Sequence, residues 1–234
     1  MTVDGWQGEH RQPPTTNCQL TSHHSVFGRD SMGDVRVWVL LVLLLVLWVE
    51  YELLRKSEAR AARIIAKFAG GAFAVVFTLL VLILRPQYLE SAIIPSDSMY
   101  PTLHIGDRLF INKAVYKRHG PKHGEVITFD AAPDMTKGIH DFWIKRVIGL
   151  PGDVVEIKDG AVYRNGKRLN EPYIRKPIQY TMEPVTVPRG MLFVLGDNRN
   201  NSCDSHEWGP LDRRRVTGRA GLRFWPLSRM GWMK

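Results

Sequence analysis

Cysteines are few, and residues with metal-ligand spacing are lacking, in this sequence of 234 residues. The two cysteines, Cys18 and Cys203, are too few for a disulfide framework, and we expect no bridge between them because Cys18 lies in a polar tail. There is no CxxC pair or Cys/His cluster, which excludes the common zinc sites. The aspartates near residue 200 match no calcium-binding loop, so we expect no metal and no cofactor.

Acidic residues are also in deficit, since 23 Asp and Glu face 32 Lys and Arg, for a net charge of +9. Such a basic protein suits nucleic acid or anionic lipid as a partner. No recognised nucleic-acid-binding motif is present, and five of the basic residues fall within the loop 55–67. We therefore expect membrane lipid, and no nucleic acid, as a partner.

Two long apolar runs interrupt an otherwise mixed composition. Residues 1–34 are polar and lack apolar periodicity, so we expect a flexible tail. The uncharged run Val37–Val49 predicts a first membrane helix over 35–54, with a buried or interfacial helix as the alternative because the run is short. The run Phe68–Leu84 predicts a second membrane helix of roughly 26 Å, nearly the thickness of the hydrocarbon core.

The loop between these runs sets the expected orientation. Residues 55–67 carry five Lys and Arg against a single acid, and such basic flanks stay cytoplasmic. Residues 85–234 are then expected on the exterior or periplasmic face of a bacterial plasma membrane, in a multi-pass protein. The apolar runs begin too far along the chain for a cleavable signal peptide.

We expect the remaining residues, 85–234, to form a mainly β domain, either Greek-key-like or coiled. Short β-branched and aromatic segments alternate with Gly, Pro, Asn and Asp, and no long amphipathic helix stands out. The dipeptides Asp159-Gly160 and Asn165-Gly166 are typical of tight hairpin turns. We expect strands within 107–116, 125–130, 143–149, 153–160, 161–169, 185–196 and 216–225.

Two polar residues could carry chemistry, although neither is diagnostic alone. Ser98 lies between turn-forming residues, where serine is usually only a turn residue. Lys145 shares a strand face with Trp143 and Val147. If that face is inward, burial lowers the pKa of the amine and makes it a general base. The segment by itself favours the other case, a solvent-facing lysine paired with an acid, because Arg146 takes the opposite face.

Three segments, in order, resemble the motifs of type I signal peptidases. IPSDSMYPTL at 94–103 resembles the nucleophile motif, DFWIKRVIGLPGD at 141–153 the lysine motif, and FVLGDNRNNSCDSHEWG at 193–209 the final motif. The resemblance implies a coiled β-sheet catalytic domain behind two membrane helices. It also implies a membrane-bound serine endopeptidase that removes signal peptides from secretory precursors, cleaving after small residues in an Ala-X-Ala pattern.

The resemblance also assigns roles residue by residue. It makes Ser98 the nucleophile and Lys145 the general base. Ser96 would help hold the oxyanion beside the Ser98 N–H, Ser202 would orient the lysine amine, and Asp204 would act through its neighbours. The small substrate pockets would be lined by Ile94, Pro95, Met99, Leu103, Trp143 and Ile144.

The sequence departs from the family motifs at several positions. Asp97 replaces a glycine, which would be unfavourable if the position needs φ > 0 or if its carboxylate faces the oxyanion. His206 replaces an arginine, which puts its salt bridge to Asp204 in doubt at neutral pH. About 50 residues separate Lys145 from Gly196, which leaves room for a minimal second β domain or none.

Alternative functions follow from these departures and from the shared chemistry. Asp97 keeps open a catalytically impaired membrane scaffold of the same fold. A self-cleaving repressor-type peptidase uses the same serine–lysine chemistry, but would need a DNA-binding domain where this chain has apolar runs. The basic, aromatic segment 222–234 could rest on the lipid interface, or form a final strand and a frayed tail.

Overall fold

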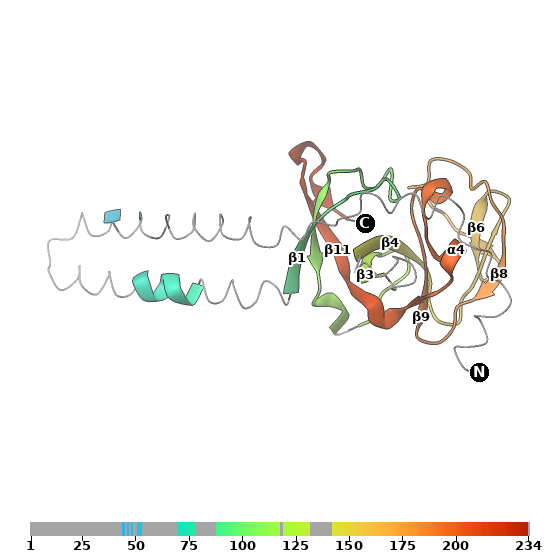
Figure 1. Cartoon of the computed structure of the whole chain (residues 1–234), viewed down its shortest axis with the longest axis horizontal. Coiled ribbons are helices and arrows are strands. Elements are labelled where there is room, and N and C mark those ends of the chain that lie inside the picture. The colour runs from blue at the N-terminus through green and yellow to red at the C-terminus, as the bar shows by residue number, and fades with distance from the viewer. Residues whose placement is uncertain are drawn as a thin grey trace. The chain divides into compact units, whose positions relative to one another are not determined.

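The computed structural model describes residues 44, 46, 48, 51–52, 70–77, 88–117, 119–131 and 142–233. From residue 88 onward the described chain is mainly β, as the turn-rich sequence predicted, with only short helices (Figure 1). The strands are β1 (Leu89–Ile93), β2 (Arg108–Asn112), β3 (Val126–Asp130), β4 (Phe142–Gly149), β5 (Val154–Lys158), β6 (Ala161–Arg164), β7 (Lys167–Arg168), β8 (Met182–Thr186), β9 (Met191–Leu195), β10 (Leu211–Asp212), β11 (Val216–Trp225) and β12 (Gly231–Trp232). The helices are η3 (Val115–Lys117), η4 (Arg199–Asn201), α4 (Ser205–Trp208), η5 (Arg213–Arg215) and η6 (Leu227–Arg229).

The larger sheet has the order β1-β2-β11-β3-β4-β9-β10, with β12 on β11. Both faces of its middle are covered, so β3 and β4 read as apolar runs with little alternation. Ile144 packs on one face with Ile94, Met99 and Leu103, whereas Val147 packs on the other with residues of β3 and β9. Lys145 and Arg146 therefore leave β4 in opposite directions.

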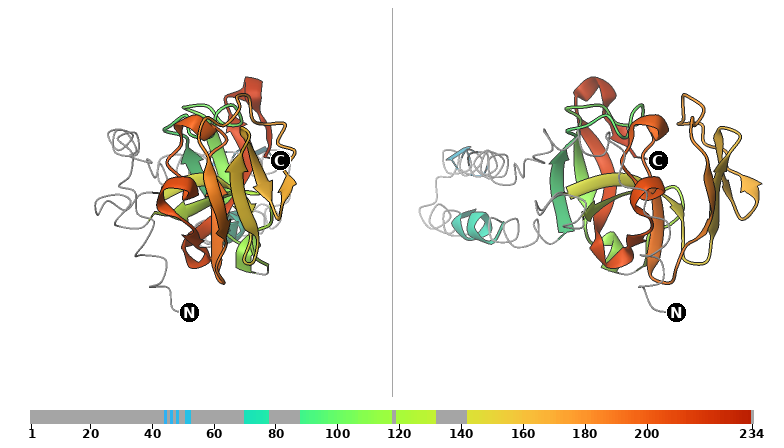
Figure 2. Two further views of the ribbon diagram at one scale, coloured as in Figure 1. Left: turned by 90° about the vertical axis from the view of Figure 1, so that its right-hand side faces the viewer. Right: turned by 45° about the vertical axis from the view of Figure 1, so that its right-hand side comes forward.

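A second, four-stranded sheet with the order β7-β6-β5-β8 lies between β4 and β9 in sequence. It has its own apolar cluster, which includes Val155, Ile157 and Val162, and Figure 2 shows it beside the larger sheet. This is the minimal second β domain that the sequence had room for. The predicted Asp-Gly and Asn-Gly turns are confirmed, since Asp159 and Asn165 have φ of 51° and 53° and are each followed by a glycine with positive φ.

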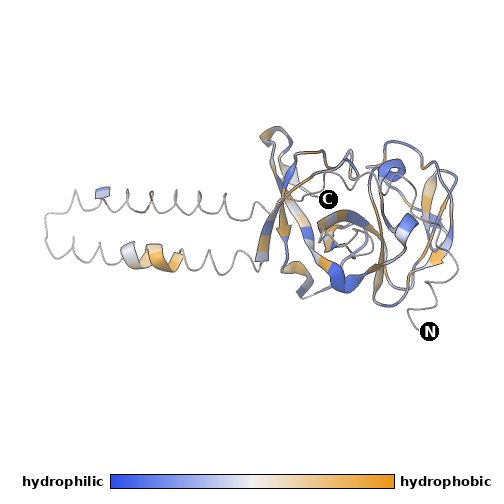
Figure 3. Ribbon diagram, viewed as in Figure 1, coloured by the Kyte–Doolittle hydropathy of each residue, from blue (hydrophilic) through white to orange (hydrophobic). Residues whose placement is uncertain are grey.

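Both apolar runs contain helix where the structure describes them. Residues 44, 46, 48, 51–52 and 70–77 are helical, and the ribbon of 70–77 is mostly apolar (Figure 3). Among the described residues, no helix has the length and apolar character needed to cross a membrane. Most of the two expected spans, the polar tail and the basic loop lie outside the described residues.

One expectation about the cysteines is wrong. Cys203 is disulfide-bonded, whereas we expected its thiol to stay unbridged. Its partner lies outside the described residues.

Candidate active site

Lys145 and Ser98 meet, although 47 positions separate them. The Lys145 Nζ lies 3.0 Å from the Ser98 Oγ, and Lys145 is only 5% exposed. Strand alternation places Trp143 on the same face, with its ring centroid 5.5 Å from the amine. The solvent-facing alternative for Lys145 is therefore wrong, because β4 is covered on both faces.

Burial sets the protonation of this amine. It lowers the pKa of Lys145 from 10.5 to about 8, against the opposing effect of the carboxylates Asp204 and Asp197. Roughly a tenth of the amines are then neutral at pH 7. A neutral amine in contact with a hydroxyl can accept its proton.

Each of these two carboxylates has a basic partner of its own. Arg146 donates to both oxygens of Asp197 at 2.8 and 2.7 Å. The His206 Nδ1 lies 2.7 Å from the Asp204 Oδ1. Burial alone would lower the pKa of His206, but the hydrogen bond and charge of Asp204 raise it overall. The contact placed in doubt by the missing arginine is therefore made by a histidine.

The nucleophile segment forms a tight turn held by the final motif. The Tyr100 N–H donates to the Asp97 carbonyl at 2.9 Å, and the Asn198 N–H donates to the Ser98 carbonyl at 3.0 Å. The Ser96 hydroxyl donates to the Ser98 Oγ at 3.3 Å. The Ser98 N–H has no acceptor among the described residues. Two donors, Ser96 Oγ–H and Ser98 N–H, thus lie beside the Ser98 oxygen.

Asp97 does not adopt the conformation that would have made it unfavourable. The only non-glycine residues with positive φ in the described chain are Asp159 and Asn165. The Asp97 carboxylate accepts hydrogen bonds from the Asn201 side chain at 3.0 and 3.2 Å. These observations remove the two physical grounds on which the impaired scaffold was considered.

Ser202 lies next to the site but does not make its expected contact. Its Oγ is buried and makes no hydrogen bond to any described residue, so the bond to the Lys145 amine is absent here. Gly196 separates Ser202 from the nucleophile turn, since a Cβ on Gly196 would overlap the Ser202 hydroxyl and lie 2.5 Å from the Ser98 carbonyl oxygen. Asp204 is fully buried and accepts from the Gly196 N–H at 2.8 Å.

The residues expected to line the substrate pockets divide into two groups. Four of them are between 0% and 4% exposed and belong to one core cluster, namely Ile94, Met99, Leu103 and Ile144. Pro95 and Trp143 are half-buried. Only Pro95 and Trp143 present appreciable surface. The other four side chains could contact a substrate only as the buried floor of a pocket.

A buried set of ion pairs that was not predicted from the sequence lies beneath the site. Besides Arg146 and Asp197, Arg199 donates to both oxygens of Glu171 at 2.9 and 2.7 Å. The Thr102 hydroxyl, from the nucleophile motif, donates to Asp197. An arginine inside an apolar strand such as β4 was a signal in the sequence for such an ion pair, because a buried guanidinium requires a carboxylate partner.

Comparison with known proteins agrees with these motifs. The family model for signal peptidase, peptidase S26, matches residues 67–225. The probable signal peptidase I-2 of Synechocystis sp. is 48% identical over 162 residues, which cover 69% of this chain and 74% of that protein. Signal peptidase I of Leptolyngbya laminosa is 44% identical, over 63% of this chain and 74% of that protein.

A plastid protein is similar as well. Thylakoidal processing peptidase 1 of Arabidopsis thaliana is 40% identical over 155 residues, which cover 64% of this chain and 46% of that protein. The family match and these identities show that the chain belongs to the signal peptidase family, peptidase S26, and that it is a serine endopeptidase.

Proposed function

We propose that this chain removes signal peptides from secretory precursors, with Ser98 as nucleophile and Lys145 as general base. The observation that carries the assignment is the 3.0 Å contact between the Lys145 amine and the Ser98 hydroxyl in a buried setting. An activated nucleophile needs a base within this distance and a pKa matched to neutral pH. The pKa of about 8 supports that match.

The reaction follows from these contacts. The neutral Lys145 amine takes the Ser98 proton as the Ser98 oxygen attacks the scissile carbonyl carbon. The Ser96 hydroxyl and the Ser98 N–H donate to the resulting oxyanion, each worth roughly 3 kcal/mol in comparable sites. The Lys145 ammonium then gives its proton to the leaving amine. Water, deprotonated by Lys145, attacks the acyl carbon, and Lys145 returns that proton to the Ser98 oxygen as the ester bond breaks.

Ser202 and Asp204 act on Lys145 in this proposal. Buried Asp204 opposes the effect of burial on the amine, and His206 limits that opposition. Ser202 makes no hydrogen bond here, so its role requires a movement that brings its hydroxyl to the amine. Catalytic hydrogen bonds are often long in the absence of substrate and tighten in the reacting complex.

The substrate is an extended precursor segment that ends its signal in Ala-X-Ala. We place its small side chains against half-buried Pro95 and Trp143, above the buried floor of Ile94, Met99, Leu103 and Ile144. Because that floor belongs to the core, it cannot recede to admit a large side chain without a cost in packing. Small residues are therefore selected.

We place the catalytic domain on the exterior face of a bacterial plasma membrane, behind helices at 35–54 and 68–84 joined by the cytoplasmic loop 55–67. The basic loop supports this orientation. Lipid contact is supported by the C-terminal hairpin, where Trp225, Leu227, Met230 and Trp232 are 50–76% exposed. The similarity to a thylakoidal peptidase gives the thylakoid membrane as a second candidate.

Cleavage of a membrane-inserted precursor tests the proposal. Ser98→Ala and Lys145→Ala should each lose at least about 1,000-fold in kcat/KM, because nucleophile and base act as a unit. Lys158→Ala is the matched control, since that lysine is exposed and its amine contacts Glu156 and the Tyr163 ring in the smaller sheet. Full activity of folded Lys145→Ala would refute the dyad, and an inactive wild-type chain would revive the scaffold alternative.

A further inference from the structure

The Asp97 side chain joins the nucleophile turn to the turn that follows β9. Both of its carboxylate oxygens accept from the Asn201 amide, at 3.0 and 3.2 Å. The Asn198 amide donates to the Asp97 carbonyl at 3.2 Å and lies 3.4 Å from the carboxylate. Asp97 thus has partners 101 and 104 positions away.

The turn after β9, which binds the Asp97 side chain, also contacts Ser98 and carries a carboxylate that acts on the Lys145 amine. Its Asn198 N–H also holds the Ser98 carbonyl, at 3.0 Å. At the other end of this turn, Asp204 accepts a hydrogen bond from the Gly196 N–H, and its charge opposes the lowering of the Lys145 pKa by burial. A shift of this turn against the nucleophile segment would therefore move the Ser98 oxygen relative to the Lys145 nitrogen.

We propose that Asp97 is a positioning residue that fixes the Ser98 hydroxyl against the Lys145 amine by anchoring the nucleophile turn on Asn201. The inference depends on the proposed roles of Ser98 and Lys145. Hydrogen bonds to a charged group are stronger than neutral ones, so two such bonds restrain a solvent-facing turn effectively. The same bonds point the Asp97 carboxylate at amide donors. Its negative charge, which would otherwise disfavour a nearby oxyanion, is thereby held by hydrogen bonds.

Removing the acceptor tests the anchor. Asp97→Leu, which has a similar size and no acceptor, should lower kcat about tenfold per active site with little change in KM, by the loss of a charge-assisted hydrogen bond. Asp97→Asn keeps one acceptor oxygen and should stay within about threefold of the wild type. Active sites are counted with a serine-acylating reagent, so partial unfolding cannot mimic the effect.

Exchanging donor and acceptor tests the contact itself. Asn201→Asp sets two carboxylates against each other and should lower kcat by about tenfold or more. Adding Asp97→Asn to that variant restores a donor opposite an acceptor and should recover most of the loss. A general effect on stability would not produce this rescue, because the second substitution would only add damage.

The outcomes separate this inference from the proposed dyad. It is overturned if Asp97→Leu matches the wild type in kcat per titrated site, or if the double variant is no better than Asn201→Asp. It is also overturned if Asp97→Leu moves the pH midpoint of kcat/KM, since Asp97 would then act on the charge of Lys145. Ser98→Ala in the same assay reports on the dyad alone.

Discussion

Lys145 is a buried amine whose charge is set by the balance of two opposing effects. Burial disfavours the ammonium, while Asp204 and Asp197 favour it without cancelling the effect of burial. The catalytic form in the proposed mechanism is the neutral one. The titration of this single group should therefore control the activity of the enzyme on the acid side.

We expect kcat/KM to rise tenfold per pH unit below about 8 and to level off above it, because the unprotonated fraction of Lys145 follows this course. Cleavage of a soluble Ala-X-Ala peptide between pH 6 and 10 measures the profile. A flat profile from pH 6 to 8 would contradict a lysine base with this pKa.

His206 allows a second prediction at this scale. His206→Gln keeps a hydrogen-bond donor for Asp204 but removes the cation. The uncompensated carboxylate should favour the ammonium and move the acid limb to higher pH by about 1. The loss should be largest on the acid limb, where His206 is charged, and should vanish on the alkaline plateau. A uniform loss at every pH would point to damaged structure instead.

Among the elements, the pairing of β4 with β9 builds the support of the site. Arg146 lies opposite Leu195, and Asp197 follows two residues later on the same face, which brings the two charges together. On the other face of β4, Lys145 faces the nucleophile turn. One strand thus supplies the proposed base, Lys145, and its neighbour Arg146, which pairs with a carboxylate near that amine.

The end of β9 should be intolerant of even one methyl group. Gly196→Ala puts a Cβ into the Ser202 hydroxyl and the Ser98 carbonyl. The nucleophile turn cannot give way without moving Ser98, so kcat/KM should fall about 100-fold or more, the usual cost of a displacement near 1 Å. Gly231→Ala is the matched control, because its added Cβ would meet open space. Equal activity of the two variants would mean that the turn yields freely.

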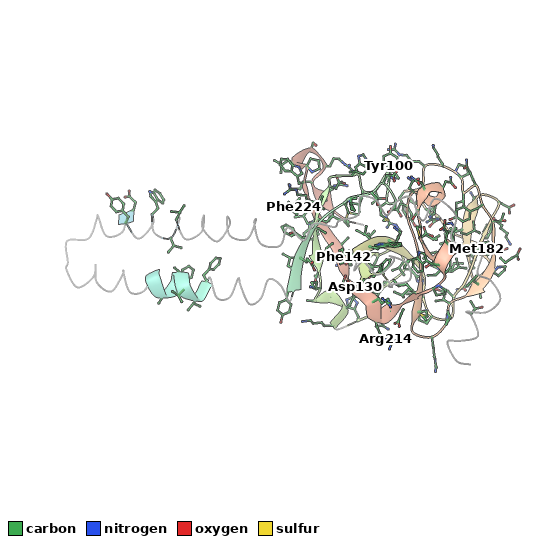
Figure 4. All side chains as sticks on the ribbon, viewed as in Figure 1. Tyr100, Asp130, Phe142, Met182, Arg214 and Phe224 are labelled. Atoms are coloured by element: carbon green, nitrogen blue, oxygen red, sulfur yellow. The ribbon has the colours of Figure 1, made fainter. Side chains whose placement is uncertain are left out.

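At the scale of the whole domain, the C-terminal hairpin concentrates exposed apolar side chains. Large exposed apolar side chains gather in the C-terminal hairpin, where Trp225, Leu227, Met230 and Trp232 follow β11. The exposed side chain of Arg214 pairs with Asp212 and points away from the domain (Figure 4). Tyr100, two residues after Ser98, is also exposed (Figure 4).

The hairpin should matter for membrane substrates only. We expect Leu227→Ser combined with Trp232→Ser to cost about tenfold on a precursor in vesicles of phosphatidylcholine and phosphatidylglycerol, because interfacial aromatic and aliphatic side chains bind at this depth. Cleavage of a soluble peptide should stay within about twofold. Equal losses on both substrates would assign the hairpin a structural role.

The sequence by itself determined most of the strands, the Asp-Gly and Asn-Gly turns, the face that Lys145 shares with Trp143, and the family, whereas β1 and β10 were not among the predicted strands. These features depend on backbone periodicity and on residue order, which are local and therefore readable along the chain. The sequence could not determine whether that face was covered. The segment around Lys145 alone favoured solvent, and only the packing of β4 between its neighbours decided otherwise.

Beyond the Ser98–Lys145 pair, only the tertiary structure decided which polar groups meet. Asp97 faces Asn201 and not an oxyanion, and His206 supplies the cation that a missing arginine left in doubt. Such pairings depend on sheet register and on the course of turns far apart in sequence, where a shift of one residue turns a side chain to the other face. No local pattern encodes that register, because it results from the packing of the whole core.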